Sequence, residues 1–202
     1  MSTTPTGSPA PRFDARTLIN IGVFTALYFV IMFATGMLGL LAPGAQIVGF
    51  LTGTLINGAI VMLFMVKTRA FGSMTLLGLI VGLLMVLTGH YWATVLITPA
   101  LGLAADALAR AGQYRNRWMN ILGFALFQQW IIAPLMPILF TADSYFADIS
   151  AQMGESYAHD MRAVFSPAAI AGLIAANFVV GLIAGWIGTK ILDKHFTRAG
   201  IL

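Results

Sequence analysis

Six long apolar stretches divide this chain, and they constrain its fold more than any other feature. The stretches cover residues 17–41, 44–66, 73–89, 91–109, 119–141 and 167–192. Each is close to the ~20 residues that an α-helix needs to cross a hydrocarbon core of about 30 Å. Charged residues make up only 9% of the chain, whereas soluble proteins carry about a quarter. The sequence therefore predicts an all-α integral membrane protein, a compact bundle of six transmembrane helices.

The basic side chains are sorted between the two sides of this bundle. With a cytoplasmic N-terminus, ten of the eleven lie on the cytoplasmic side: Arg12, Arg16, Lys67, Arg69, Arg110, Arg115, Arg117, Lys190, Lys194 and Arg198. Arg162 alone lies outside. Four of the seven acids share its loop: Asp143, Asp148, Glu155 and Asp160. Because Lys and Arg in short loops set orientation during insertion, both termini are expected inside (N-in, C-in). Anionic lipid beside the helix ends accounts for the net charge of +4, so no nucleic-acid partner is expected.

The chain is expected to form one membrane domain, residues 13–202, after a disordered cytoplasmic tail, residues 1–12. The long outer loop, residues 142–166, is amphipathic and contains an apolar stripe with a period of four, which Gly154 is expected to interrupt. The stripe consists of Tyr145, Ile149, Met153, Tyr157, Met161 and Phe165. This segment either caps a cavity between helices or only anchors the loop at the membrane surface.

Small residues recur four positions apart, a spacing that lets helix backbones approach closely in lipid. The pairs are Gly22/Ala26, Gly49/Gly53, Gly78/Gly82 and Gly181/Gly185. We expect the last three pairs to pack inside the bundle. Gly22 and Ala26 lie in the cytoplasmic third of the first stretch, so they are the candidates for contact with a partner protein.

Motifs of ATP-hydrolysing and other hydrolytic enzymes are missing. Residues 188–190 lack the glycine loop of a phosphate-binding motif, and neither Gly-x-Ser-x-Gly nor His-Glu-x-x-His occurs. Asp106 is the only acid within a stretch, and Arg110 follows at the i,i+4 spacing of a helical ion pair. That pairing weakens a proton-relay mechanism. We therefore predict no enzyme, and any uphill transport would draw on an ion gradient or on another protein.

Polar side chains deep in the stretches bind neighbouring helices or face a pocket. For Asn57 we expect an interhelical hydrogen bond. Gln129, Trp130 and Asn177 fall in or near the outer halves of their helices, which favours a pocket.

Two histidines are expected on the outer side. His90 with Tyr91 and Trp92 forms either an interfacial aromatic belt or a site for a metal or an aromatic ring. His159 lies in the long loop, on the far side of the stripe if the helix there is continuous.

Four strings in the chain resemble a known family of membrane subunits. They are NIGVFTALYF at 20–29, LTGH at 87–90, DSYF at 143–146 and KHF at 194–196. Over residues 13–196 the chain is similar to the S-components of energy-coupling factor (ECF) transporters, and most similar to the Trep_Strep group. The resemblance implies a multi-pass protein of a prokaryotic cytoplasmic membrane that binds a micronutrient near its outer face. It also implies a transmembrane coupling subunit and two cytoplasmic ATPase subunits as partners. In that family the S-component topples against the coupling subunit. The resemblance implies that Gly22 and Ala26 form the small-xxx-small motif that meets this subunit, with Gly in place of the usual first Ala.

The resemblance leaves the substrate open. The chain begins Met1-Ser2, whereas cobalt- and nickel-type S-components begin Met-His, so those metals are not expected. The outer aromatics, His90 and Arg162 suit a flat ligand with carboxylates, and haem is the leading candidate for the transported ligand. A vitamin or a nucleobase-like compound is the alternative substrate. A stand-alone secondary transporter or channel is the alternative function.

The expected site residues fall into two groups, and no cofactor of its own is expected. The substrate-binding residues are His90, Tyr91, Trp92, Gln129, Trp130, Tyr145, Tyr157, Arg162 and Asn177, with His90 and His159 as ligands of the haem iron. Gly22 and Ala26 form the interface with the coupling subunit.

Overall fold

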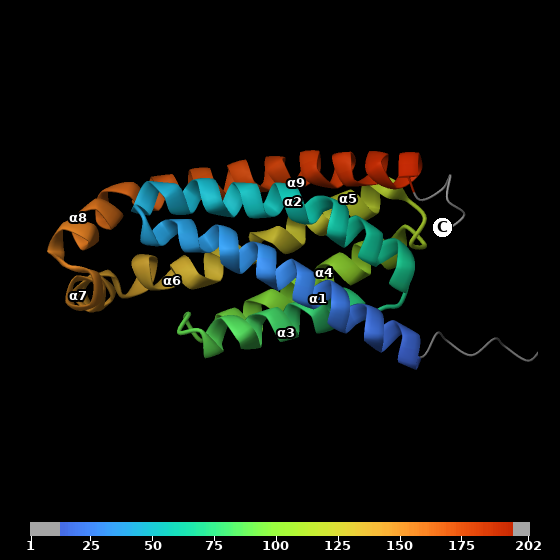
Figure 1. Cartoon of the computed structure of the whole chain (residues 1–202), viewed down its shortest axis with the longest axis horizontal. Coiled ribbons are helices and arrows are strands. Elements are labelled where there is room, and N and C mark those ends of the chain that lie inside the picture. The colour runs from blue at the N-terminus through green and yellow to red at the C-terminus, as the bar shows by residue number, and fades with distance from the viewer. Residues whose placement is uncertain (1–12, 196–202) are drawn as a thin grey trace, which may run out of the picture.

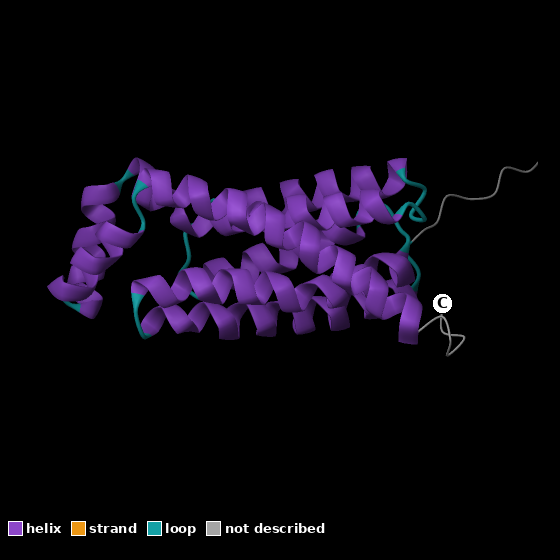
Figure 2. Cartoon of the chain, turned by 90° about the horizontal axis from the view of Figure 1, so that it is seen from above, coloured by secondary structure: helices purple, strands orange, loops and turns teal. Residues whose placement is uncertain are grey.

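The computed structural model describes residues 13–195, and this part of the chain is helical with no strand (Figure 1; Figure 2). Its helices are α1 (Ala15–Gly36), η1 (Met37–Leu40), α2 (Pro43–Thr68), α3 (Ser73–Leu87), α4 (Thr94–Ala111), α5 (Arg117–Phe127), η2 (Gln128–Ile131), α6 (Ile132–Phe140), α7 (Ala142–Met153), α8 (Glu155–Val164) and α9 (Pro167–His195). The predicted tail, residues 1–12, lies outside the described residues, as do Arg198 and Phe196.

Five helical segments are long and apolar enough to cross a membrane. They are Ala15–Leu40, Pro43–Thr68, Thr94–Ala111, Arg117–Phe140 and Pro167–Lys194. The predicted third span is the apolar helix α3, which has 15 residues and is therefore only about 22 Å long. The all-α membrane class is thus supported. Five of the six predicted spans correspond to long apolar segments. The other predicted span corresponds to the shorter helix α3, so the count of six stays a prediction.

The helices run along one long axis, and α7 and α8 lie across one end of the bundle (Figure 1). At the opposite end lie the start of α1, the end of α9 and the α2–α3 and α4–α5 connections. The described basic residues other than Arg162 sit in these segments, so we call this the basic end. The sorting of charge between two ends matches the prediction. The N-in, C-in orientation stays a prediction from the positive-inside rule.

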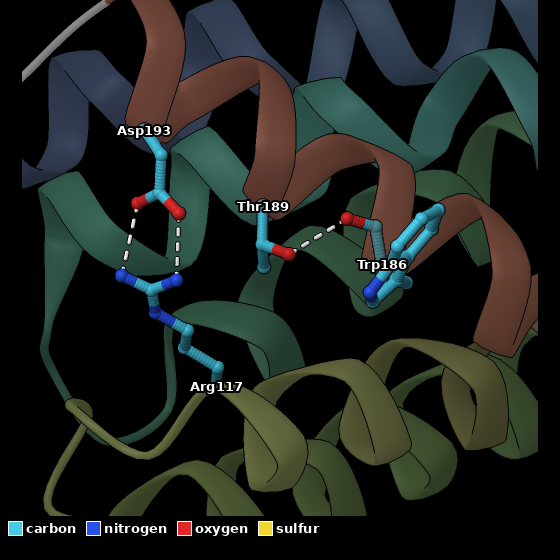
Figure 3. A network of polar contacts seen from close by, with 4 residues as sticks. All are labelled: Arg117, Trp186, Thr189 and Asp193. Atoms are coloured by element: carbon cyan, nitrogen blue, oxygen red, sulfur yellow. Dashed lines mark hydrogen bonds and ion pairs between the residues drawn. The ribbon is translucent and has the colours of Figure 1, made fainter.

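An ion pair ties two helices together at the basic end. The Arg117 guanidinium, at the start of α5, donates to both carboxylate oxygens of Asp193 near the end of α9, at 2.6 and 3.0 Å (Figure 3). One turn earlier, the Thr189 hydroxyl donates to the carbonyl oxygen of Trp186 at 2.7 Å. Both members of the ion pair are exposed, so it adds about 1 kcal/mol at most.

The three glycine pairs assigned to internal packing do lie at helix–helix contacts. A Cβ added to Gly49 would meet the carbonyl oxygen of Thr35, on α1. One added to Gly78 would lie 2.7 Å from the carbonyl oxygen of Thr98, on α4, and Gly181 meets α5 in the same way. Close backbone approach increases the van der Waals packing that helps to hold helices together in lipid. These pairs therefore hold α1 to α2, α3 to α4 and α5 to α9.

A buried polar network crosses the middle of the bundle. Tyr28 donates its hydroxyl hydrogen to the Gln128 side-chain oxygen and accepts from Trp130 Nε1 at 2.6 Å. Gln128 Nε2 donates to the hydroxyl of Thr54 at 2.9 Å, and that hydroxyl donates to Asn177 Oδ1 at 2.7 Å. Asn177 Nδ2 donates to the carbonyl oxygen of Gln128 at 2.8 Å, at the start of the 3-10 segment η2. Lipid-embedded backbone can leave α-helical geometry where side chains bind the freed groups in this way.

The prediction for Asn57 is confirmed, because its side-chain nitrogen donates to the carbonyl oxygen of Tyr28 on α1 at 3.4 Å. Asn177 was expected to face a pocket, but other side chains and backbone surround it. Asn177 is fully buried, and both its amide groups bind inside the network.

The predicted Asp106–Arg110 ion pair is absent from the described residues. Asp106 is 1% exposed and accepts instead from the backbone nitrogens of Met74 and Thr75 at 3.1 and 2.9 Å. It also accepts from the Thr75 hydroxyl at 2.6 Å. These donors open α3, which has no capping side chain of its own, so Asp106 caps α3 from the neighbouring helix. Arg110 lies over the ring of Phe71, at 5.3 Å from its centroid.

Candidate functional site

Two adjoining pockets lie at the α7–α8 end of the bundle. The first, which we call the polar pocket, has a volume of about 470 Å³. It is lined by Thr88, Gly89, His90, Tyr91, Pro134, Pro137, Thr141, Ser144, Tyr145, Asp148, Ile149 and Gln152. The second, which we call the methionine pocket, has a volume of about 230 Å³. It is lined by Met32, Phe33, Gly36, Met37, Gly39, Leu40, Gln46, Phe50, Met85, His90, Trp130, Tyr145, Ile149, Met153, Tyr157 and Met161. His90, Tyr145 and Ile149 line both pockets.

Helix α7 separates the two pockets because of its residue spacing. Side chains four positions apart lie on one face of a helix. Ser144, Asp148 and Gln152 form a polar row that lines the polar pocket. The row beside it, Tyr145, Ile149 and Met153, lines the methionine pocket. The stripe predicted from the sequence therefore covers a cavity rather than only anchoring the loop.

Gly154 interrupts the stripe as expected and divides the segment into α7 and α8. Its backbone has φ +92° and ψ 158°, a conformation that only glycine adopts without strain. Tyr157 fastens α8 to η1, because its hydroxyl donates to the carbonyl oxygen of Gly39 at 2.6 Å. Burial, with Tyr157 nearby, raises the pKa of Tyr145 to about 12, so the Tyr145 phenol keeps its proton at neutral pH.

One ring nitrogen of His90, Nδ1, forms hydrogen bonds within the protein. Its Nδ1 lies 3.1 Å from the carbonyl oxygen of Met85 and 3.1 Å from the Thr88 hydroxyl oxygen. Because a carbonyl only accepts, Nδ1 carries the hydrogen, and the neutral ring then keeps a lone pair on Nε2. Burial lowers the pKa of His90 below its usual value of 6.5, which favours this neutral form. The ring can therefore accept a hydrogen bond or bind a metal through Nε2.

The low pKa of His90 predicts a pH dependence of stability. As the pH falls below about 6.5, the unfolded chain takes up a proton at His90 before the folded protein does. The free energy of unfolding should then decrease until the pH passes the folded-state pKa. We expect His90→Asn to lose this part of the pH profile and the exposed His159→Asn to retain it, measured by denaturation at a series of pH values. Identical profiles for His90→Asn and the unchanged protein would contradict the prediction.

Five of the predicted substrate-binding residues meet at the pockets. They are His90, Tyr91, Trp130, Tyr145 and Tyr157. Trp130 is 1% exposed and directs its indole N–H away to Tyr28, so it offers ring surface to the methionine pocket.

Four other predicted residues line neither pocket. Trp92 is 59% exposed and packs against Tyr91. Gln129 donates to the carbonyl oxygen of Ala125, one turn back on its own helix, at 2.9 Å. Arg162 is half exposed. Asn177 belongs to the network.

The side chains of Arg162 and His159 lie on the surface of α8 and contact neighbouring side chains there. The Arg162 guanidinium lies over the ring of Phe146, 4.5 Å from its centroid, and 3.7 Å from a carboxylate oxygen of Asp143. The His159 side chain is 84% exposed and lies 3.6 Å from Asp160. Neither side chain lines a pocket with His90. Within residues 13–195, no three His, Cys, Asp or Glu side chains converge as a metal site.

The sequence interpretation missed the methionine wall. Met32, Met37, Met85, Met153 and Met161 come from five helices and line one pocket. Only Met153 and Met161 carried a signal in the sequence, since they belong to the stripe. Asp148 was noted only as an outer acid, although its spacing from Ser144 and Gln152 places it on a pocket wall.

Comparison with protein families agrees with this architecture. The family model described as a hypothetical bacterial integral membrane protein (Trep_Strep) matches residues 15–198, almost the whole described chain. The chain belongs to the Trep_Strep family. No curated protein and no solved structure matches it.

As a Trep_Strep protein, the chain is a multi-pass integral membrane protein, in agreement with its long apolar helices. Both pockets and every element that lines them fall inside the matched residues. The lipid bilayer is therefore its surroundings, and the pockets open at one end of its membrane helices.

Proposed function

We propose that this Trep_Strep protein is the S-component of an ECF-type importer in a bacterial cytoplasmic membrane. In this proposal it captures a micronutrient in the pockets at the α7–α8 end, which faces outside. It then delivers the micronutrient inward by toppling against a transmembrane coupling subunit, which two separate ATPase subunits drive. The proposal rests mainly on which of the four small-residue pairs pack against a neighbouring helix and which does not.

Three of those pairs are filled by neighbouring helices, and Gly22/Ala26 is not. A Cβ added to Gly22 would have no atom within 4 Å, and Ala26 is exposed. Large apolar side chains surround the pair on the same helix: Leu18, Ile19, Val23, Leu27 and Val30 are all exposed. A lipid-facing helix needs no small residues, because apolar side chains of any size suit hydrocarbon. A small pair left open therefore supports a site where another helix docks.

The pockets support the binding half of the proposal. They are concave, partly apolar and lined by a few convergent polar groups, the usual make-up of a small-molecule site. The absence of a phosphate-binding motif agrees with ATPases on separate chains.

Haem as the ligand stays a prediction. His90 fits one of its requirements, because Nε2 keeps a lone pair that can bind iron. The carboxylates of haem require basic partners, and Arg162 is engaged with Phe146 and Asp143 instead. We therefore propose a micronutrient without assigning it to haem.

Co-purification tests the proposed function. Gly22→Leu with Ala26→Leu should abolish capture of the coupling subunit and ATPases from the same bacterium when all are expressed together. Two leucines would fill the surface into which a partner helix packs. A Cβ at Gly22 would meet no atom within 4 Å, and Ala26 is exposed. Thermal unfolding of the isolated double variant should stay unchanged.

The matched control is Val48→Leu, a change between two large apolar side chains at an exposed position of α2. This variant should still capture the complex. Unchanged capture by the Gly22/Ala26 double variant would refute the docking face. Uptake by vesicles that contain this chain alone would favour a secondary transporter or channel.

A further inference from the structure

We infer that the two pockets together bind an organic cation: a ligand whose positive, hydrogen-bond-donating group sits in the polar pocket and whose apolar body sits in the methionine pocket. The inference rests on the proposed function for the role of the pockets as the substrate site. It goes further by naming the chemical class of the substrate.

The three Ser and Thr hydroxyl groups of the polar pocket donate hydrogen bonds to backbone carbonyl oxygens. Thr88 donates to Met85 at 2.8 Å, Thr141 to Pro137 at 3.3 Å, and Ser144 to Thr141 at 3.0 Å. A hydroxyl whose hydrogen is committed presents only lone pairs to its other side. In this arrangement each of the three side chains offers an acceptor to a ligand.

Two further acceptors line the same pocket. His90 keeps a lone pair on Nε2, because its Nδ1 hydrogen is committed to Met85 and Thr88. Asp148 adds a carboxylate to the polar row of α7. The donors left on the walls are the Gln152 amide and the phenols of Tyr91 and Tyr145. The pocket is thus biased toward ligands that donate hydrogen bonds.

The charge around the site has the same bias. Among the residues that line the two pockets there is no Lys or Arg. The α7–α8 segment carries four carboxylates and one guanidinium, a net charge of −3 with histidines neutral. The guanidinium, that of Arg162, lies over Phe146 outside both pockets. Inside the pockets an anion would meet the Asp148 carboxylate and no Lys or Arg, whereas a cation gains from both the charge and the aromatic faces.

The methionine pocket supplies the apolar half of the site. Five methionines, Trp130 and Phe50 line it, together with the apolar row of α7. Thioethers are polarisable and adapt to the outline of a flat ring, and sulfur packs favourably against aromatic edges. His90, Tyr145 and Ile149 line both pockets, so the two pockets are immediate neighbours, and in this inference one ligand occupies both.

The test uses two probes with the same apolar body and opposite charge, 4-phenylbutylammonium and 4-phenylbutanoate. Each is titrated calorimetrically into the purified full-length protein in lipid nanodiscs. We expect the cation to bind roughly tenfold more tightly than the anion, as a charge-assisted hydrogen bond implies. Asp148→Asn should weaken cation binding about two- to fivefold, the range for an exposed charge pair.

Asp143→Asn is the matched control, since Asp143 lies on the same helix, is fully exposed and lines neither pocket. This variant should leave cation binding unchanged. Haem serves as a second anionic probe, read from its visible absorption band. Tighter binding of the anion or of haem than of the cation would overturn the inference, and so would absence of cation binding or an equal effect of the two Asp variants. None of these results affects capture of the coupling subunit, so the proposed function is judged separately.

Discussion

Gly58→Leu is expected to destabilise the folded protein by about 3 kcal/mol, near the upper end of the usual cost of overpacking a core. A Cβ at Gly58 would lie 2.5 Å from the carbonyl carbon of Ala184 and 2.8 Å from its Cβ. Gly188 faces Gly58 from α9, where an added Cβ would lie 2.7 Å from the Gly58 carbonyl oxygen. The atoms in the way are mostly backbone, so no side-chain rotation relieves the clash. Helices α2 and α9 would have to move apart along their contact.

Denaturation of detergent-solubilised protein with SDS measures this effect. Gly172→Leu is the control, because it gains the same helix propensity of about 1 kcal/mol on α9 without meeting any atom within 4 Å. We expect this variant to be as stable as the unchanged protein or slightly more stable. Equal stabilities of the two leucine variants would show that α2 and α9 do not pack through Gly58.

Asp106→Ala is expected to cost about 3 kcal/mol, because it leaves the donors at the start of α3 without an acceptor. Asp106 accepts from two backbone nitrogens and one hydroxyl in a site that water does not reach. Asp106→Asn retains one acceptor oxygen and should cost about half as much. The same denaturation assay measures both variants, and hydrogen exchange at Met74 and Thr75 reports on the cap directly.

Arg110→Ala separates capping from the ion pair that the sequence suggested. Arg110 contacts the Phe71 ring, so its removal should cost only about 0.5–1 kcal/mol. Its effect should also add to that of Asp106→Ala in the double variant, because the two side chains share no interaction. A non-additive double variant, with Arg110→Ala as costly as Asp106→Ala, would favour the ion pair.

Patterns between near neighbours in the sequence predicted much of the fold and part of the site. The lengths of the apolar stretches predicted the long helices, and α3 came out short because its stretch was short. The four-residue stripe predicted a helical segment in the outer loop with an interruption expected at Gly154, where α7 ends and α8 begins. His90 was recognised because it lies in the outer turn between two apolar stretches, and Tyr145 because it belongs to the four-residue stripe.

Three other residues have different partners from those that the sequence suggested, because more than one partner was compatible with their positions. Arg110 was the obvious partner of Asp106 one turn away, but the carboxylate faces α3 and finds backbone donors 31 and 32 residues distant. Arg162 was expected in the site, and its position on α8 turns it toward Phe146. Asn177 was expected in a pocket, and its rotation on α9 brings it to Gln128 and Thr54.

The sequence by itself determined that this chain enters a membrane, where its helices run, which end collects the basic residues and which small pairs allow close approach. These properties depend on composition and on spacing within one helix. Only the tertiary structure decided that Gly22 and Ala26 stay open, that five methionines form one wall and that pocket hydroxyls present lone pairs. Such outcomes depend on how each helix is rotated about its axis against its neighbours. Packing over the whole bundle sets that rotation, and no local repeat encodes it.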